Sequence, residues 1–104
     1  MRVIDFFSGC GGSSLGMEQA GLNVILAIDL WEDACETHEL NIDCPVWCED
    51  INVIESSELP PCDVIIGSPP CQKFSQANYY DRNYDDALVK RFMQIVHEVN
   101  PDYW

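Results

Sequence analysis

A cysteine in the middle of the chain stands where a reactive thiol could be held rigidly. Cys71 lies in the sequence GSPPCQ of residues 67–72, directly after the apolar, β-branched run of residues 64–66. Such a run is typical of a buried strand, and the two prolines exclude a helix and fix an extended turn. Because the thiolate is the nucleophilic form of cysteine, a position fixed in advance favours nucleophilic attack by Cys71. An incidental buried cysteine in a loop is the alternative that this stretch alone leaves open.

Glycines and carboxylates follow the other predicted strands, at the ends where parallel sheets bind ligands. The turn after the first apolar run contains Gly9, Gly11 and Gly12, and glycines let a backbone approach a ligand closely. Asp29 ends the second run and could accept hydrogen bonds from both hydroxyls of a ribose. Asp50 follows a weaker third strand and could hold the exocyclic amine of an adenine. A solvated strand end remains open for Asp29, and the glycine spacing disfavours a dinucleotide because it is not G-x-G-x-x-G.

The spacing of apolar residues predicts strands and helices in alternation. Strands are expected at residues 3–7, 24–29, 46–48 and 63–67. The first helix should be capped by Ser13 or Ser14 and should stop at Gly21. Alternation of this kind implies an α/β fold, with a parallel sheet and helices on both of its faces.

Two more helices and a long loop complete the pattern. A second helix is expected to have one face formed by Trp31, Ala34, Cys35 and His38. A last helix should begin at Asp85 and end at Asn100, with an apolar side formed by Leu88, Phe92, Ile95, Val96 and Val99. Residues 52–62 should form a short helix or loop, and residues 73–84 a long mobile loop of the kind that often carries function. The chain stops at residues 102–104, where a fifth strand should start, so a fragment is expected.

The bulk properties favour one domain of a protein that is not secreted. With 104 residues, 47% of them hydrophobic, the chain can form at most one domain with a modest core. No apolar run approaches the roughly 20 residues that cross a bilayer, and the N-terminus does not resemble a signal peptide. We therefore expect a cytoplasmic protein, or a nuclear one in a eukaryote, with no membrane partner.

The six cysteines are expected to be reduced thiols. They fall within helix-like and strand-like segments, whereas disulfide-rich domains usually lack such long apolar runs. A zinc site could be formed by His38, Cys44, Cys48 and Cys62. No C-x-x-C pair is present, however, so we expect no metal.

The net charge of −13 disfavours direct binding to nucleic acid by this stretch. Eighteen acidic residues against five basic ones make a poor surface for phosphate backbones. A solubility or high-salt adaptation is an alternative origin for this charge.

Two motifs resemble those of one family. Residues 5–12, DFFSGCGG, resemble the first motif of the cytosine-C5 DNA methyltransferases, and residues 67–75, GSPPCQKFS, resemble their catalytic motif. The order and separation of the two motifs also match, and the resemblance covers the whole chain. It implies a Rossmann-like fold that depends on S-adenosylmethionine. It also implies that residues 1–104 are the N-terminal portion of the catalytic domain, without its target-recognition domain.

The resemblance assigns roles residue by residue. It implies that S-adenosylmethionine is bound by Phe7, Gly9, Gly11, Gly12, Asp29, Asp50, Ile51, Pro70 and Leu88. It makes Cys71 the nucleophile, gives Gln72 and Ser75 to the substrate, and makes residues 73–84 the loop that closes over an extruded base. Two departures are visible: Ser68 replaces a frequent glycine, and Leu30 with Trp31 replaces the usual aromatic after the strand-two acid.

The implied reaction is methylation of cytosine C5 in double-stranded DNA, on a base flipped out of the helix. The Cys71 thiolate would attack C6, which turns the electron-poor ring into an enamine whose C5 accepts the methyl group. The family uses a glutamate of a Glu-Asn-Val motif to assist at N3, and that motif is absent from these residues. The fragment alone is therefore expected to be inactive.

Three other functions share some of these sequence features. An exocyclic-amine methyltransferase shares a Pro-Pro core but needs an aromatic residue where Cys71 stands, so it is disfavoured. A tRNA cytosine-C5 methyltransferase has a similar Ser-Pro-Pro-Cys-Gln motif and stays open. One half of a split or regulatory methyltransferase also stays open.

Overall fold

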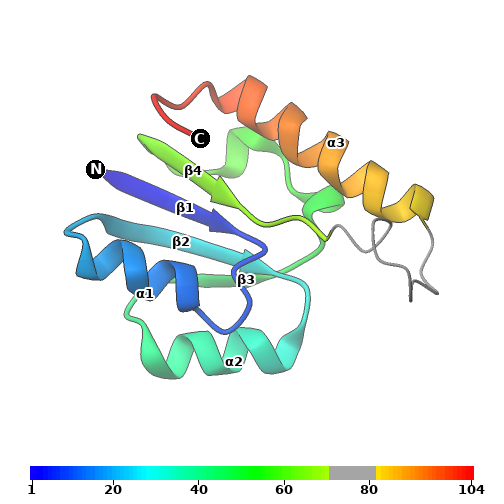
Figure 1. Cartoon of the computed structure of the whole chain (residues 1–104). Coiled ribbons are helices and arrows are strands. Elements are labelled where there is room, and N and C mark those ends of the chain that lie inside the picture. The colour runs from blue at the N-terminus through cyan, green and yellow to red at the C-terminus, as the bar shows by residue number, and fades with distance from the viewer. Residues whose placement is uncertain (71–81) are drawn as a thin grey trace.

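A four-stranded parallel sheet forms the centre of the molecule (Figure 1). The computed structural model describes residues 1–70 and 82–104 of the chain. The strands are β1 (Arg2–Phe6), β2 (Asn23–Asp29), β3 (Val46–Cys48) and β4 (Val64–Gly67). They lie in the order β3-β2-β1-β4, so β1 is flanked on both sides. All four predicted strands are confirmed.

Helices cover both faces of the sheet, as predicted (Figure 1). On one face lie α1 (Gly12–Gln19) and α2 (Glu32–Asn41). On the other face lie α3 (Arg82–Val99) and two short 3₁₀-helices, η1 (Ile51–Val53) and η2 (Ser56–Glu58). These short helices confirm the prediction for the segment between β3 and β4. This placement of the helices is expected, because connections between parallel strands are short and right-handed and place each helix beside the strands that it connects.

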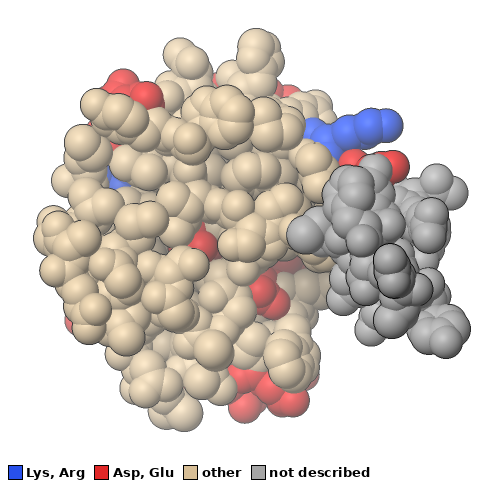
Figure 2. Space-filling model, in the orientation of Figure 1, with Lys and Arg blue, Asp and Glu red and all other residues tan. Residues whose placement is uncertain are grey.

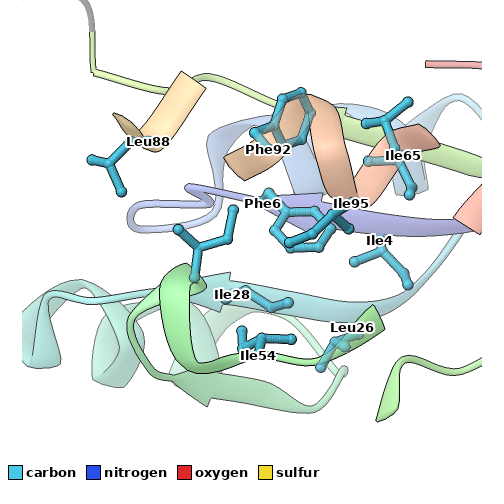
Figure 3. Close-up of a cluster of buried hydrophobic side chains, with 11 residues drawn as sticks. Ile4, Phe6, Leu26, Ile28, Ile54, Ile65, Leu88, Phe92 and Ile95 are labelled. Atoms are coloured by element: carbon cyan, nitrogen blue, oxygen red, sulfur yellow. The ribbon is translucent and has the colours of Figure 1, made fainter. Parts of the chain in front are cut away.

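Alternating side chains divide the core into two clusters, one on each face of the sheet. The larger cluster lies under α3 and is formed by Ile4, Phe6, Leu26, Ile28, Ile51, Ile54, Ile65, Leu88, Phe92, Ile95 and Val96 (Figure 3). Within it, the rings of Phe6 and Phe92 meet edge to face, with centroids 5.7 Å apart. The smaller cluster of Val3, Val24 and Val64 lies on the opposite face and includes Met17 of α1. The apolar side predicted for the last helix is therefore confirmed.

Three predictions about helix ends are wrong. Gly11, and not Ser13 or Ser14, is the N-cap of α1, in a left-handed conformation with φ 105°. Ser14 lies inside the helix and is fully buried, because its hydroxyl binds tertiary partners described below. Trp31 does not share the buried face of α2; it is the N-cap of that helix and is 66% exposed. The last helix begins at Arg82 rather than Asp85, so residues 82–84 are helical.

The outer edge of β4 pairs with the end of the chain. Val64 forms an isolated parallel bridge with Tyr103. The amide of Ile65 donates to the Tyr103 carbonyl, and the amide of Tyr103 donates to the Asp63 carbonyl, both at 3.1 Å. Tyr103 thus pairs with β4 where a fifth strand was expected to start, and the pairing is an isolated bridge rather than a strand.

Within residues 1–70 and 82–104, no helix combines the length and the apolar character needed to span a membrane. Cys10, Cys35, Cys44, Cys48 and Cys62 are free thiols. The described part of the chain also contains no group of three metal-ligating side chains, and the residues considered for zinc are not gathered in one site.

Candidate active site

A pocket of about 570 Å³ opens at the carboxyl ends of the strands. This is the edge at which open α/β sheets bind ligands. Its lining comes from the ends of all four strands and from the start of α3, and consists of Phe6, Phe7, Ile28, Asp29, Leu30, Trp31, Glu49, Asp50, Ile51, Ser68, Pro70 and Leu88. Acidic side chains are visible in the hollowed part of the face at this end of the molecule (Figure 2).

The pocket brings together most of the residues that the sequence predicts for a cofactor. The lining includes Phe7, Asp29, Asp50, Ile51, Pro70 and Leu88. Gly9, Gly11 and Gly12, which the sequence predicts for the same cofactor, are not in the lining. Glu49 lines the pocket without having been predicted, and its place directly before Asp50 is the signal that could have found it. Cys71, Gln72 and Ser75 lie outside the described residues.

Asp29 is held in place through both of its carboxylate oxygens. Oδ2 accepts a hydrogen bond from the amide of Gly9 at 2.8 Å, and Oδ1 accepts one from the amide of Trp31 at 2.9 Å. Each carboxylate oxygen can accept two hydrogen bonds, so acceptor capacity remains on the pocket side. The glycine-rich turn therefore orients the acid at the end of β2.

Asp50 caps η1 with one oxygen. Its Oδ1 accepts hydrogen bonds from the backbone amide of Asn52 at 2.9 Å and from Asn52 Nδ2 at 3.0 Å. Among residues 1–70 and 82–104, Oδ2 has no hydrogen-bond partner, and Asp50 lines the pocket. One oxygen is thus committed to the fold, and the other is available to a donor in the pocket.

Apolar side chains also line the pocket. Ile51 and Leu88 are almost fully buried, and Phe7 packs edge to face on Phe92 with centroids 6.0 Å apart. Phe7 has φ 57°, a left-handed conformation that is costly for a bulky residue. The left-handed conformation turns the chain at the end of β1, and Phe7 lies in the pocket lining.

Gly67, the first residue of the proline-rich motif, is required by packing. A Cβ atom built on it would lie 2.5 Å from Phe92 Cε2 and 2.6 Å from Phe92 Cζ. Contacts this short do not occur between real atoms, so the Phe92 ring would have to move. The absence of a side chain at Gly67 lets α3 approach β4 beside the pocket.

A buried polar network supports the glycine-rich turn from below. Ser14 Oγ donates to Asp5 Oδ2 at 2.7 Å and lies 2.9 Å from Nε2 of His38. Burial raises the pKa of Asp5, and the hydrogen bond from Ser14 opposes that rise. His38 Nδ1 is buried without a hydrogen-bond partner among the described residues. The network ties β1, α1 and α2 together at the turn.

Packing in the same region also requires a glycine at position 11. A Cβ atom there would lie 2.6 Å from Ile42 Cδ1 and 3.0 Å from His38 Cδ2. The left-handed conformation adds a second reason for glycine. In this structure Gly11 serves the packing of the turn against α2 and the residue that follows it.

The family model for C-5 cytosine-specific DNA methylases matches residues 1–104. The chain belongs to this family. The family resemblance and the Rossmann-like fold that the motifs predicted are confirmed.

One relative of this chain is the type II methyltransferase M.HgiDI of Herpetosiphon aurantiacus, which is 38% identical over 97% of this chain. The chain covers 34% of that relative, so it spans about a third of its length.

Two solved structures share the fold. A candidate DNA modification methyltransferase encoded within an E. coli prophage has a TM-score of 0.84 and 33% identity, over 97% of this chain and 30% of that one. The plantazolicin methyltransferase BpumL, in complex with a desmethylPZN analog and SAH, has a TM-score of 0.51 and 28% identity, over 62% of this chain and 26% of that one.

Proposed function

We propose that the complete protein transfers a methyl group from S-adenosylmethionine to C5 of cytosine in double-stranded DNA. The observation that carries the proposal is the pocket at the strand ends. It is lined by Asp29, Asp50 and apolar side chains, and by Pro70 of the Pro-Pro-Cys-Gln motif. Residues 1–104 are proposed to be the N-terminal portion of the catalytic domain, because M.HgiDI is about three times as long as the part of it that the chain matches.

The hydrogen-bond acceptors and apolar side chains of the pocket fit S-adenosylmethionine. Asp29 presents an oriented carboxylate suited to two ribose hydroxyls, and Asp50 Oδ2 suits an exocyclic amine. Phe7, Ile51 and Leu88 offer apolar contact to a flat base. BpumL, which shares the fold, has been solved with SAH. When bound, S-adenosylmethionine supplies the methyl group.

The glycines are proposed to serve the cofactor indirectly. Gly9 holds the Asp29 carboxylate through its amide, while Gly11 and Gly12 form the N-terminal start of α1. Pro70 closes one side of the pocket, immediately before the proposed nucleophile. These residues would therefore fix the cofactor and the thiol relative to each other.

Cys71 is proposed to attack cytosine C6 as the thiolate. A new S–C6 bond saturates the ring and makes C5 an enamine carbon, nucleophilic enough to accept a methyl group. Loss of the C5 proton to a base then returns the electron pair to the ring and expels the Cys71 thiolate. Gln72 and Ser75 are proposed to contact the flipped cytosine and its phosphate backbone.

A methyl-transfer assay with three polymers tests this proposal. The complete protein is incubated with radiolabelled S-adenosylmethionine and mixed-sequence duplex DNA, the same DNA with cytosine already methylated at C5, or tRNA. We expect label in the unmodified DNA, recovered as 5-methylcytosine, and little in the other two. Label in tRNA alone would refute DNA as the substrate in favour of RNA. Label recovered on the exocyclic nitrogen of cytosine would refute methylation at C5.

A further inference from the structure

Two thiols converge beside the acidic end of β2, from α2 and from β3. Cys35 Sγ donates to the Asp29 carbonyl at 3.6 Å, and Cys48 Sγ donates to the carbonyl of the next residue, Leu30, also at 3.6 Å. Cys48 pairs with Asp29 in the parallel register of β2 and β3, so both thiols lie beside the same two adjacent carbonyl groups. A disulfide requires the two sulfur atoms to meet at roughly 2.05 Å.

The pair is set apart from the other thiols that the structure describes. Cys44 and Cys62 precede β3 and β4, at the amino ends of the parallel strands, whereas the pocket opens at the carboxyl ends. Cys35 and Cys48 come from different elements that flank the connection between β2 and α2. Leu30 and Trp31, which form that connection, line the pocket.

Exposure distinguishes the two thiols chemically. Cys48 is exposed, whereas Cys35 is only 4% exposed. The pKa of the Cys35 thiol is raised to about 12. Burial is the largest cause, and the neighbouring Cys48 is the next largest. A dissolved oxidant therefore meets Cys48 first, and Cys35 is the group placed to react second.

We propose that Cys35 and Cys48 form a reversible disulfide in response to peroxide, and that this bond weakens cofactor binding in the adjoining pocket. The Cys48 thiolate attacks one oxygen of hydrogen peroxide and gives a sulfenic acid and hydroxide. The Cys35 sulfur then forms the S–S bond and displaces the sulfenic oxygen, which leaves as water with the Cys35 proton. Two thiols and one peroxide thus yield one disulfide and two waters, and a dithiol reductant reverses the step.

The bond would act on the pocket through the β2–α2 connection. Forming it removes both S–H donors, so the Leu30 carbonyl loses the hydrogen bond from Cys48, while the Asp29 carbonyl keeps the Glu49 amide at 2.9 Å. It also draws the first turn of α2 toward the end of β3, across Leu30 and Trp31. Since the Trp31 amide holds Asp29 Oδ1, the proposed ribose acceptor is displaced. This second step rests on the proposed function.

The test uses the complete protein with Cys71→Ser, so that oxidation of the proposed nucleophile does not contribute. The protein is treated with hydrogen peroxide, its free thiols are alkylated, and its peptides are mapped by mass spectrometry. We expect a Cys35–Cys48 cross-link that dithiothreitol removes. In calorimetry, S-adenosylhomocysteine should bind the oxidised protein about tenfold more weakly, the equivalent of one hydrogen bond.

Two matched variants in the same background separate the possible results. Cys48→Ser changes an exposed residue and should abolish both the cross-link and the loss of affinity, whereas Cys62→Ser should behave like the parent. Absence of the Cys35–Cys48 cross-link would overturn the proposed site. A cross-link with unchanged affinity would overturn its effect on the pocket. If the reduced protein does not bind S-adenosylhomocysteine, the cofactor assignment fails, and the cross-link is still judged by the mass spectrum.

Discussion

Asp29 shows how one side chain can be oriented before a ligand arrives. Gly9 and Trp31 donate backbone hydrogen bonds to its two oxygens, from the turn after β1 and from the start of α2. The carboxylate is therefore preorganised, and a ligand does not have to order it. The same contacts make Asp29 part of the local fold as well as of the pocket.

Replacing Asp29 by alanine should weaken binding of S-adenosylmethionine by about 1.5–3 kcal/mol, or more than tenfold, through loss of charge-assisted hydrogen bonds to the ribose. Titration calorimetry on the complete protein measures this. Asp33→Ala removes a nearby exposed carboxylate that does not line the pocket, and it should leave the affinity unchanged. Equal affinities for Asp29→Ala and the parent would contradict the assignment.

Gly67→Ala should destabilise the fold by about 1–3 kcal/mol, because the new methyl group would overlap the Phe92 ring. Gly16→Ala is the matched control. A Cβ atom at Gly16 meets nothing within 4 Å, so alanine should stabilise α1 by about 0.5–1 kcal/mol. Chemical denaturation of the two variants provides the comparison. Similar stability changes in both would show that Gly67 is not required by packing.

The roles of some residues at and beside the pocket can be predicted from the sequence, and the roles of others cannot. Asp29 and Asp50 could be found because each directly follows a predicted strand. The packing roles of Gly11 and Gly67 could not, since the atoms that exclude a side chain belong to His38, Ile42 and Phe92, in segments distant along the chain. Local sequence shows that a glycine is present and does not show which neighbour requires it.

At the scale of elements, a buried polar network joins β1, α1 and α2. Ser14 is its centre, because its hydroxyl contacts both Asp5 and His38 and all three residues are buried. A serine at the start of a helix usually predicts a cap, and that prediction fails here because the hydroxyl binds tertiary partners. The strands were predictable from their apolar runs, whereas the start of α1 could not be placed because Ser14 makes contacts with other elements.

Ser14→Ala should lower the free energy of unfolding by about 1–3 kcal/mol, since it leaves Asp5 and His38 buried without this partner. Ser13→Ala, at an exposed position in the same turn of α1, should change it little. Thermal or chemical denaturation distinguishes them. If the two variants are equally stable, the network does not support the turn.

At the scale of the whole molecule, the net charge and the outer edge of the sheet bear on the proposed function. The net charge of −13 disfavours tight binding of phosphate backbones, so Gln72 and Ser75 alone are not expected to hold DNA tightly. The outer edge of β4 accepts Tyr103 in parallel pairing. The bridge is parallel, like the other strand pairs of the sheet.

Residues 1–104 expressed alone should neither methylate DNA measurably nor bind it tightly, even with saturating S-adenosylmethionine. They contain the proposed nucleophile but no Glu-Asn-Val motif, and losing a positioned general acid typically costs about 10²–10⁴-fold. Radiolabelled methyl transfer by the isolated segment measures this. Robust turnover would show that the catalytic groups have been misassigned.

The most direct test of the central claim, that Cys71 attacks C6 while the strand-end pocket holds the cofactor, is covalent trapping on duplex DNA that contains 5-fluorocytosine. Fluorine at C5 cannot leave as a proton does, so the enzyme–DNA adduct persists after methyl transfer. The complete protein should give an adduct that survives denaturing electrophoresis, with the modified base attached to Cys71. Cys71→Ser should give no adduct and still bind S-adenosylhomocysteine. An adduct that forms equally well with Cys71→Ser would contradict the account.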